Sequence, residues 1–189
     1  AECLLLLSVL TAATWKQTKI WHDTESLWGY LAATDPSLRF AQNAMGNIRL
    51  SQGRSDEAIS YYRAAIAIDP NYGAAHNNLG NLLSNKGLHH EAIEHYRQAL
   101  QNSPGHATTH FNWGLSLLRL GQLDGAISHF REELRIDASA PQPHIILGQA
   151  LAAQGKKSEA AESFRAALRI NPEDRQAQLE LDALRRKSK

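Results

Sequence analysis

The stretch LGNLLSNKGLHHEAIEHYRQALQNSP, residues 79–104, contains the pattern that decides the fold. Its leucines, from Leu79 to Leu83, have the three- and four-residue spacing of one helix face. Gly87 predicts the end of that helix, because glycine tolerates the left-handed backbone that commonly follows a helical C-terminus. A second helix is predicted from near His89, and Pro104 stops it, because the residue before a proline is pushed out of helical geometry. The stretch therefore predicts two helices joined by a tight turn.

The same pattern recurs every 34 residues, in columns of small, aromatic and turn-forming residues. We expect the small residues to lie where the two helices of a unit cross closely, with the aromatic side chain filling the space beyond that crossing. The first-helix glycines are Gly46, Gly80, Gly114 and Gly148, the second-helix alanines are Ala58, Ala92, Ala126 and Ala160, and the aromatic residues are Tyr62, Tyr96, Phe130 and Phe164. The turn glycines are Gly53, Gly87, Gly121 and Gly155, and the closing prolines are Pro70, Pro104 and Pro172. Columns in register across four units predict an internal helical repeat.

The starts of the second helices and the third unit give two further predictions. Ser55, Asp124 and Ser158 stand near helix starts and are predicted to be N-caps. In the third unit Glu133 takes the place of an alanine, and Ala138 takes the place of the closing proline. The second helix of that unit is therefore predicted to run on or to pack less tightly.

These columns resemble the tetratricopeptide repeat, whose pattern is a Leu-Gly pair, an alanine followed four residues later by an aromatic residue, and a proline. The resemblance implies an all-α fold, a right-handed superhelix (α-solenoid) of antiparallel helix pairs. It also implies a scaffold that binds proteins or peptides, with no catalysis and no cofactor. The four repeats it implies are residues 39–72, 73–106, 107–140 and 141–174.

Both ends of the chain continue the pattern in weaker form. Residues 1–38 are predicted to hold a degenerate leading repeat, with Leu4–Trp15 as its first helix and Asp23–Ala33 as its second. Residues 175–189 are predicted to form a closing helix and a basic tail, since a solenoid needs a terminal helix with a polar outer face.

The apolar N-terminal run leaves two interpretations open. Cys3–Trp15 is shorter than the ~20 residues that span a bilayer, so it can be a buried first helix. However, residues 15–28 are similar to a junction in bacterial transmembrane-and-tetratricopeptide proteins, where a glycosyltransferase-like membrane region precedes the repeats. That resemblance implies attachment to a membrane and an extracytoplasmic repeat domain. The alternative function is then substrate recruitment for a membrane-bound glycosyltransferase-like enzyme whose catalytic part is absent from this chain; otherwise a cytoplasmic scaffold is expected.

In the tetratricopeptide family the first helices line a concave groove that holds a peptide. A row of carboxamides suits this task, because each offers donors and an acceptor to a peptide backbone. The alternative is that these side chains are simply solvated. Arg49 and Arg119 are the groove cations, whereas Phe40, Ala74 and Thr108 stand where a carboxylate-binding clamp would need charge. The predicted groove residues are Asn43, Asn47, Asn77, Asn78, Asn81, Phe111, Asn112 and Arg119.

Charge and histidine spacing argue against two classes of function, nucleic-acid binding and metal binding. With 20 basic and 19 acidic residues, the formal net charge is +1, which gives no electrostatic argument for a nucleic-acid partner. His76, His110 and His144 lie 34 residues apart, and packed helices stand ~8–10 Å apart, too far for two nitrogens on one zinc ion. We expect these histidines to pack between repeats, and we expect no metal site. A third interpretation of the function is self-association through the exposed ends of the repeats.

Overall fold

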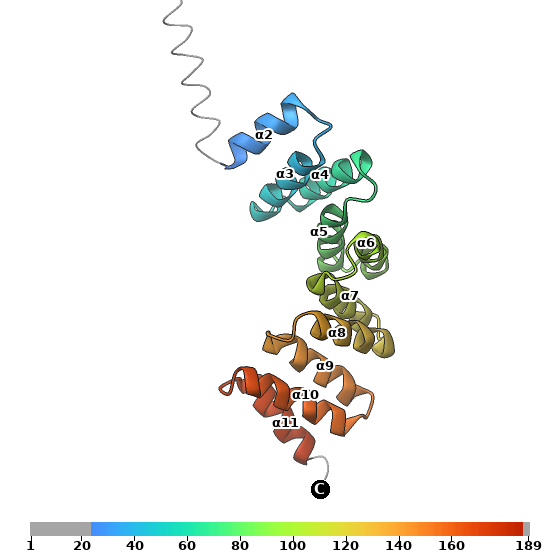
Figure 1. Ribbon diagram of the computed structural model, residues 1–189, viewed down its shortest axis with the longest axis vertical. Coiled ribbons are helices and arrows are strands. Elements are labelled where there is room, and N and C mark those ends of the chain that lie inside the picture. Colours follow the sequence, from blue (N-terminus) through green and yellow to red (C-terminus); the bar gives the residue numbers. More distant parts are fainter. Residues whose placement is uncertain (1–23, 187–189) are drawn as a thin grey trace, which may run out of the picture. The chain divides into compact units, whose positions relative to one another are not determined.

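The computed structural model describes residues 24–186, which form helices α2 to α11 and contain no strand (Figure 1). The predicted helix Leu4–Trp15 and the basic tail beyond Arg186 lie outside the described residues. Within the described part, no helix is both long and apolar enough to cross a membrane. The helices fall into two compact units, one ending at Leu79 and the other beginning at Gly80, within α5.

The first unit contains one complete helix pair. Helix α2, close to the predicted second helix of the leading repeat, packs on α3, which pairs with α4. The buried side chains of this unit include Met45 and Tyr62. The helix bounds are α2 Thr24–Thr34, α3 Arg39–Ser51, α4 Ser55–Ile68 and α5 Gly73–Asn85.

The second unit contains the remaining pairs. Helices α7 and α8 pack together, as do α9 and α10, and α11 closes the unit against α10 and α9 (Figure 1). Its core is a continuous apolar cluster centred on Phe130 and Phe164. The bounds are α6 His89–Asn102, α7 Ala107–Arg119, α8 Leu123–Ile136, α9 Pro141–Ala153, α10 Lys157–Ile170 and α11 Arg175–Arg186.

The aromatic column lies directly on the glycine column. A Cβ atom added to Gly148 would stand 2.6 Å from Cε1 of Phe164, and one added to Gly114 would stand equally close to Phe130. The prediction that the aromatic ring fills space beyond the helix crossing is therefore wrong. The ring occupies the crossing itself, and the glycine is there because no side chain fits beneath the ring.

The turn between the helices of a pair is a Schellman motif. Gly87 has a φ of +82°, its N–H donates to the carbonyl of Ser84, and the N–H of Leu88 donates to the carbonyl of Leu83. Leu88 is at the same time the N-cap of α6, and it makes no side-chain capping bond. The other second helices are capped in the same way by Arg54, Gln122 and Lys156.

The prediction that Ser55, Asp124 and Ser158 are N-caps is therefore wrong. Each lies inside the first turn of its helix, because the preceding Schellman motif already places the N-cap on the residue after the glycine. Acidic side chains such as Glu57 and Glu159 still lie in these first turns, where their negative charge interacts favourably with the positive end of the helix dipole.

The third repeat ends its second helix without a proline. Helix α8 has 14 residues, the same length as α4, α6 and α10, so the prediction that it runs on is wrong. The carboxylate of Asp137 accepts the backbone N–H of Ser139 at 2.9 Å, and this turn stops the helix. Glu133 is only 6% exposed and therefore lies inside the helix packing.

In each of the first helices α3, α5 and α7, one side chain near the helix start is bonded to the loop before it. Nε2 of His76 lies 2.9 Å from the carbonyl oxygen of Pro70, and Nε2 of His110 lies 3.1 Å from that of Pro104. Gln42 occupies the same column and donates to the carbonyl of Pro36 at 3.3 Å. The carbonyl can only accept, so each Nε2 carries the hydrogen. The column thus attaches first helices to their preceding loops, and residues 24–186 contain no cluster of three or more side chains that could hold a metal ion.

His129 of α8 forms a half-buried aromatic cluster with α7 that the sequence did not predict. Its ring stacks on Trp113 with centroids 4.1 Å apart, and its Nδ1 lies 3.0 Å from Nδ1 of His110. Because His110 donates through Nε2, its Nδ1 accepts, and His129 is the donor of this pair. Burial, followed by the charge of His110, lowers the pKa of His129 to about 4, and Glu132 acts in the opposite direction.

Acidification is expected to destabilise the second unit through His129. The unfolded chain accepts a proton near pH 6.5 and the folded chain only near pH 4, so the free energy of unfolding falls within that window. We expect the contribution of His129 to fall by about 1 to 2 kcal/mol, measured as the difference between the wild-type chain and His129→Phe in urea unfolding at a series of pH values. His129→Phe keeps an aromatic ring on Trp113 and should flatten this part of the profile. Equal slopes in the two proteins would contradict the assignment.

Candidate functional site

In the first unit, asparagine side chains connect the adjacent helices α3 and α5. Nδ2 of Asn78 donates to Oδ1 of Asn43 at 3.0 Å and to Oδ1 of Asn47 at 3.1 Å. The hydroxyl of Tyr62 also donates to Oδ1 of Asn47, at 2.8 Å. Burial raises the pKa of Tyr62 to about 12, so this hydroxyl remains a donor at neutral pH. The Asn47 carboxamide is thus held by its oxygen, and among the described residues its Nδ2 has no partner.

The second unit repeats this bond one step later. Nδ2 of Asn112 on α7 donates to Oδ1 of Asn81 on α5 at 2.8 Å. The two residues are 31 positions apart, as are Asn78 and Asn47. We call these two bonded pairs, Asn47 with Asn78 in the first unit and Asn81 with Asn112 in the second, the carboxamide ladder.

Further along the second unit, the side chains paired at this 31-residue step are no longer asparagines. Leu115 and Ile146 occupy the next pair of positions, and both pack against the apolar core. One repeat later the step is polar again, because Nε2 of Gln149 donates to a carboxylate oxygen of Glu180 at 2.7 Å. The two units therefore present different surfaces on their first helices. The first unit presents carboxamides, and the second presents a carboxamide segment, then an apolar segment, then an acidic one.

The ladder leaves hydrogen-bonding capacity open. A primary amide has two donors and an oxygen with two lone pairs, and each ladder bond uses only part of that set. Oδ1 of Asn112 and Nδ2 of Asn81 make no bond among residues 24–186. Asn78 and Asn112 are partly exposed, so both can reach a ligand at the surface. A fixed carboxamide with one open donor or acceptor matches the alternating N–H and C=O groups of an extended peptide.

One predicted groove column lies deeper than expected. Asn43 is buried, Ile145 at the equivalent position belongs to the core, and the Phe111 ring stands 5.8 Å from that of Phe130. This column was expected to face outward, and for Asn43 that expectation is wrong, because its helix position turns it toward α5 and Asn78. Asn77, in the same column, is half-buried and has interactions within the structure.

The two predicted groove cations have different environments. Arg49 forms ion pairs with Glu25 at 2.5 Å and with Glu57 at 3.5 Å, and its side chain is 14% exposed, so its charge is already paired within the first unit. Arg119 is exposed. It lines a hollow of about 370 Å³ in the second unit, together with Ser84, His89 and Leu115. Arg119 is thus the better placed of the two for an acidic group of a ligand.

The bonds within the ladder were not identified from the sequence. The columns were compared at the repeat period of 34, whereas side chains on successive first helices meet at a step of 31. A search for polar pairs at that shorter step would have found both asparagine pairs and Gln149 with Glu180.

Comparison with known proteins agrees with this architecture. The profile of a family described as tetratricopeptide repeat matches residues 43–107, 79–143 and 111–175. No curated protein matches the sequence. Among solved structures, the chain is similar to YrrB, described as a TPR protein with an unusual peptide-binding site, with a TM-score of 0.78 and 18% identity over 85% of this chain and 83% of that one.

Two structures of MamA are also similar. One has a TM-score of 0.72 and 20% identity over 77% of this chain and 85% of MamA. The other, from Desulfovibrio magneticus RS-1, has a TM-score of 0.74 and 18% identity over 79% and 85% of the two chains. At these identities the likeness concerns the fold, and it confirms the predicted all-α solenoid architecture. Because the family profile covers well over half of the sequence, the chain belongs to the tetratricopeptide repeat family.

Proposed function

We propose that the chain is a protein-binding scaffold, without catalytic activity of its own, that holds extended peptide segments on the first helices of each unit. The observation that carries the proposal is the carboxamide ladder. Its side chains are fixed by one another and by Tyr62, yet Asn78 and Asn112 keep an open acceptor at a partly exposed position. Membership of the tetratricopeptide repeat family supports it, as does the similarity to YrrB, which is described as having a peptide-binding site.

Such a ladder recognises the backbone of a peptide ligand more than the ligand's side chains. Carboxamides in a fixed orientation bind the repeating N–H and C=O groups of an extended strand, and fixing them beforehand lowers the entropy lost on binding. In the second unit the apolar pair Leu115 and Ile146 follows the ladder, and Arg119 lies near Leu115. The peptide we propose for this unit is therefore extended, with an apolar residue near Leu115 and a carboxylate within reach of Arg119.

Replacing Asn112 by alanine is expected to weaken peptide binding about fivefold, and Asn78→Ala with Asn112→Ala together by at least about tenfold, since each lost hydrogen bond costs about 1 kcal/mol. The probe is a synthetic 12-residue peptide, selected on the wild-type chain from a phage-displayed random library. Its affinity for each variant is measured by fluorescence anisotropy.

Gln101→Ala is the matched control, because Gln101 is an exposed carboxamide on the second helix α6, outside both the ladder and the hollow beside Arg119. Its affinity for the peptide should stay at the wild-type value, and the helical circular-dichroism signal should be the same in all variants. Loss of Asn78 also leaves the buried Asn43 oxygen without a donor, so the Asn112 variant is the cleaner test. Unchanged affinity in the double variant would exclude the ladder as the binding surface.

Two finer hypotheses come from the sequence alone. Membrane attachment rests on residues 1–23, outside the described residues, and flotation of the chain with lipid vesicles tests it. Self-association through the ends of the repeats is tested by gel filtration over a dilution series, in which a concentration-dependent elution volume is expected if the chain oligomerises.

A further inference from the structure

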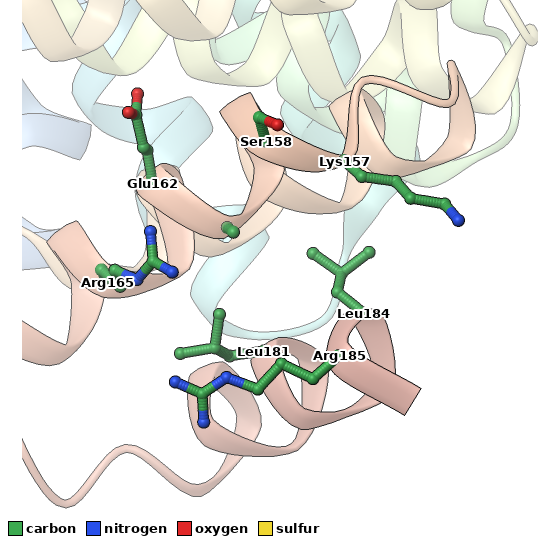
Figure 2. Close-up of a pocket in the computed structure, with 8 residues that line it drawn as sticks. Lys157, Ser158, Glu162, Arg165, Leu181, Leu184 and Arg185 are labelled. Atoms are coloured by element: carbon green, nitrogen blue, oxygen red, sulfur yellow. The ribbon is translucent and has the colours of Figure 1, made fainter. Parts of the chain in front are cut away.

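A groove lies open between α10 and α11 at the end of the second unit. It encloses about 580 Å³. Ala161, Leu181 and Leu184 form its apolar part, and Lys157, Arg165 and Arg185 stand around it. Figure 2 shows the two leucines rising from α11 toward α10, with Lys157 and Arg165 toward opposite ends of the α10 segment that borders the groove.

The internal repeat shows what such a groove accommodates. One repeat earlier, the residues equivalent to Ala161, Leu181 and Leu184 are Ile127, Leu147 and Ala150. Those three side chains are 3%, 6% and 1% exposed, and the helix pair α9 and α10 packs at that position. At the α10–α11 groove, Ala161 and Leu184 are only partly buried. The groove is therefore the position at which the second helix of a pair would pack, and no helix among residues 24–186 occupies it.

The charges around the groove indicate which helix fits. Helix α10 is joined to α8 by an ion pair between Glu159, in its first turn, and Arg131, at 2.6 Å. Arg165 is the equivalent of Arg131 one repeat later, and within residues 24–186 it forms neither an ion pair nor a hydrogen bond. The arginine that would receive a first-turn carboxylate is thus in place.

A second difference strengthens the charge preference. Arg185 stands where the equivalent residue one repeat earlier is Leu151, which is buried. Both walls of the groove therefore carry cations, and Glu162 is the one carboxylate among the groove residues. Arg185 is paired with Asp182 of α11 at 3.3 Å, whereas Arg165 has no such partner among residues 24–186. A neutral apolar helix would therefore desolvate Arg165 without compensation, and a helix with a carboxylate in its first turn would pair with it.

We propose that this groove binds an amphipathic α-helix of a partner protein, with a carboxylate in its first turn beside Arg165 and its apolar stripe on Leu181 and Leu184. The binding mode is a helix in a groove, with anchors three and four residues apart. This surface is separate from the carboxamide ladder and takes a different kind of ligand, a folded helix in place of an extended peptide.

The test uses a peptide with the chemistry of the repeat's own second helices. The sequence of α4, Ser55–Ile68, has Asp56 and Glu57 in its first turn and Ala58, Tyr62 and Ala65 on one face. A fluorescently labelled synthetic α4 peptide is titrated with the full chain at low salt, and anisotropy reports binding. We expect Arg165→Glu to weaken binding at least tenfold, and a peptide with both acidic residues changed to lysine to bind the wild-type chain as weakly.

A charge exchange makes the test specific. The lysine-substituted peptide should regain at least fivefold in affinity on the Arg165→Glu chain, because the ion pair is restored with its signs reversed. Arg175→Glu is the matched control, an exposed arginine of α11 outside the groove, and it should leave binding unchanged. Asn112→Ala should also leave it unchanged, which separates this proposal from the ladder. Binding that is equal in the Arg165→Glu and Arg175→Glu chains, or absent from the wild-type chain, would overturn the proposal.

Discussion

Replacing Gly46 by alanine is expected to lower the free energy of unfolding by about 2 to 3 kcal/mol, despite the higher helix propensity of alanine. The added Cβ atom would stand 2.6 Å from Cδ1 of Tyr62. Tyr62 is fully buried and its hydroxyl is bonded to Asn47, so the ring cannot move aside without breaking that bond or shifting α4. Thermal unfolding followed by circular dichroism should show a fall in midpoint of roughly 5 to 10 °C.

Gly29→Ala is the control within the same unit. Gly29 also lies inside a helix, α2, but its added Cβ atom would stand 3.9 Å from the sulfur of Met45, an ordinary contact distance. We expect this variant to be unchanged or to gain up to about 1 kcal/mol from helix propensity alone. If the two variants had the same stability, the ring of Tyr62 would not be packed on Gly46 as described.

Replacing Glu133 by alanine is expected to stabilise the chain by about 2 to 3 kcal/mol at pH 8. Burial, with a smaller contribution from the charge of Asp137, raises the pKa of Glu133 to about 7. Its Oε2 has no hydrogen-bond partner among the described residues. Because the unfolded chain releases this proton near pH 4.5, the destabilisation grows as the pH rises from 4.5 to 7 and is complete above that. The equivalent residues Ala65, Ala99 and Ala167 show that alanine fits this position.

Two companion variants separate charge from packing. Glu133→Gln keeps the shape and removes the ionisation, so its stability should lose the part of the pH dependence between 4.5 and 7 that Glu133 contributes, while the opposite contribution of His129 remains. Glu132→Ala removes the neighbouring carboxylate, which is paired with Arg135 at the surface, and should change stability by less than about 0.5 kcal/mol. Urea unfolding at pH 5 and pH 8 distinguishes these cases. A stabilisation by Glu133→Ala that is equal at both values would show that burial of the charge is not its cause.

Much of the fold could be predicted because each repeat packs in the same way. A glycine recurs at 34-residue intervals only if the same contact is made each time, and the contact with the aromatic ring is indeed repeated from Gly46 to Gly148. The turn glycines were predictable for a similar reason, since all four adopt a positive φ that other residues rarely adopt.

The errors in the prediction have a common cause. N-capping was assigned from residue type alone, but the position of the cap depends on how the preceding helix ends, as at Leu88. In the third repeat the absence of a proline was taken as the absence of a stop, although Asp137 supplies one through its side chain. Residue types at single positions did not reveal these hydrogen bonds, because each bond joins a residue to a backbone group whose position is set by its neighbours.

The candidate site was predictable in its composition but not in its connections. The asparagine columns pointed to a carboxamide surface, and Asn78 and Asn112 belong to it. That Asn43 lies beneath this surface, that Arg49 is committed to Glu25 and Glu57, and that His129 stacks on Trp113 became visible only in three dimensions.

The sequence by itself determined the repeat, its period and the family, because backbone geometry and close packing impose the same small and aromatic residues on every unit. Only the tertiary structure decided which polar side chains are satisfied within the protein and which remain open to a ligand. The physical reason is that hydrogen bonds and ion pairs depend on distances of a few tenths of an ångström between residues about 30 positions apart. The rotation of one helix against the next sets those distances, and residue spacing alone does not specify that rotation.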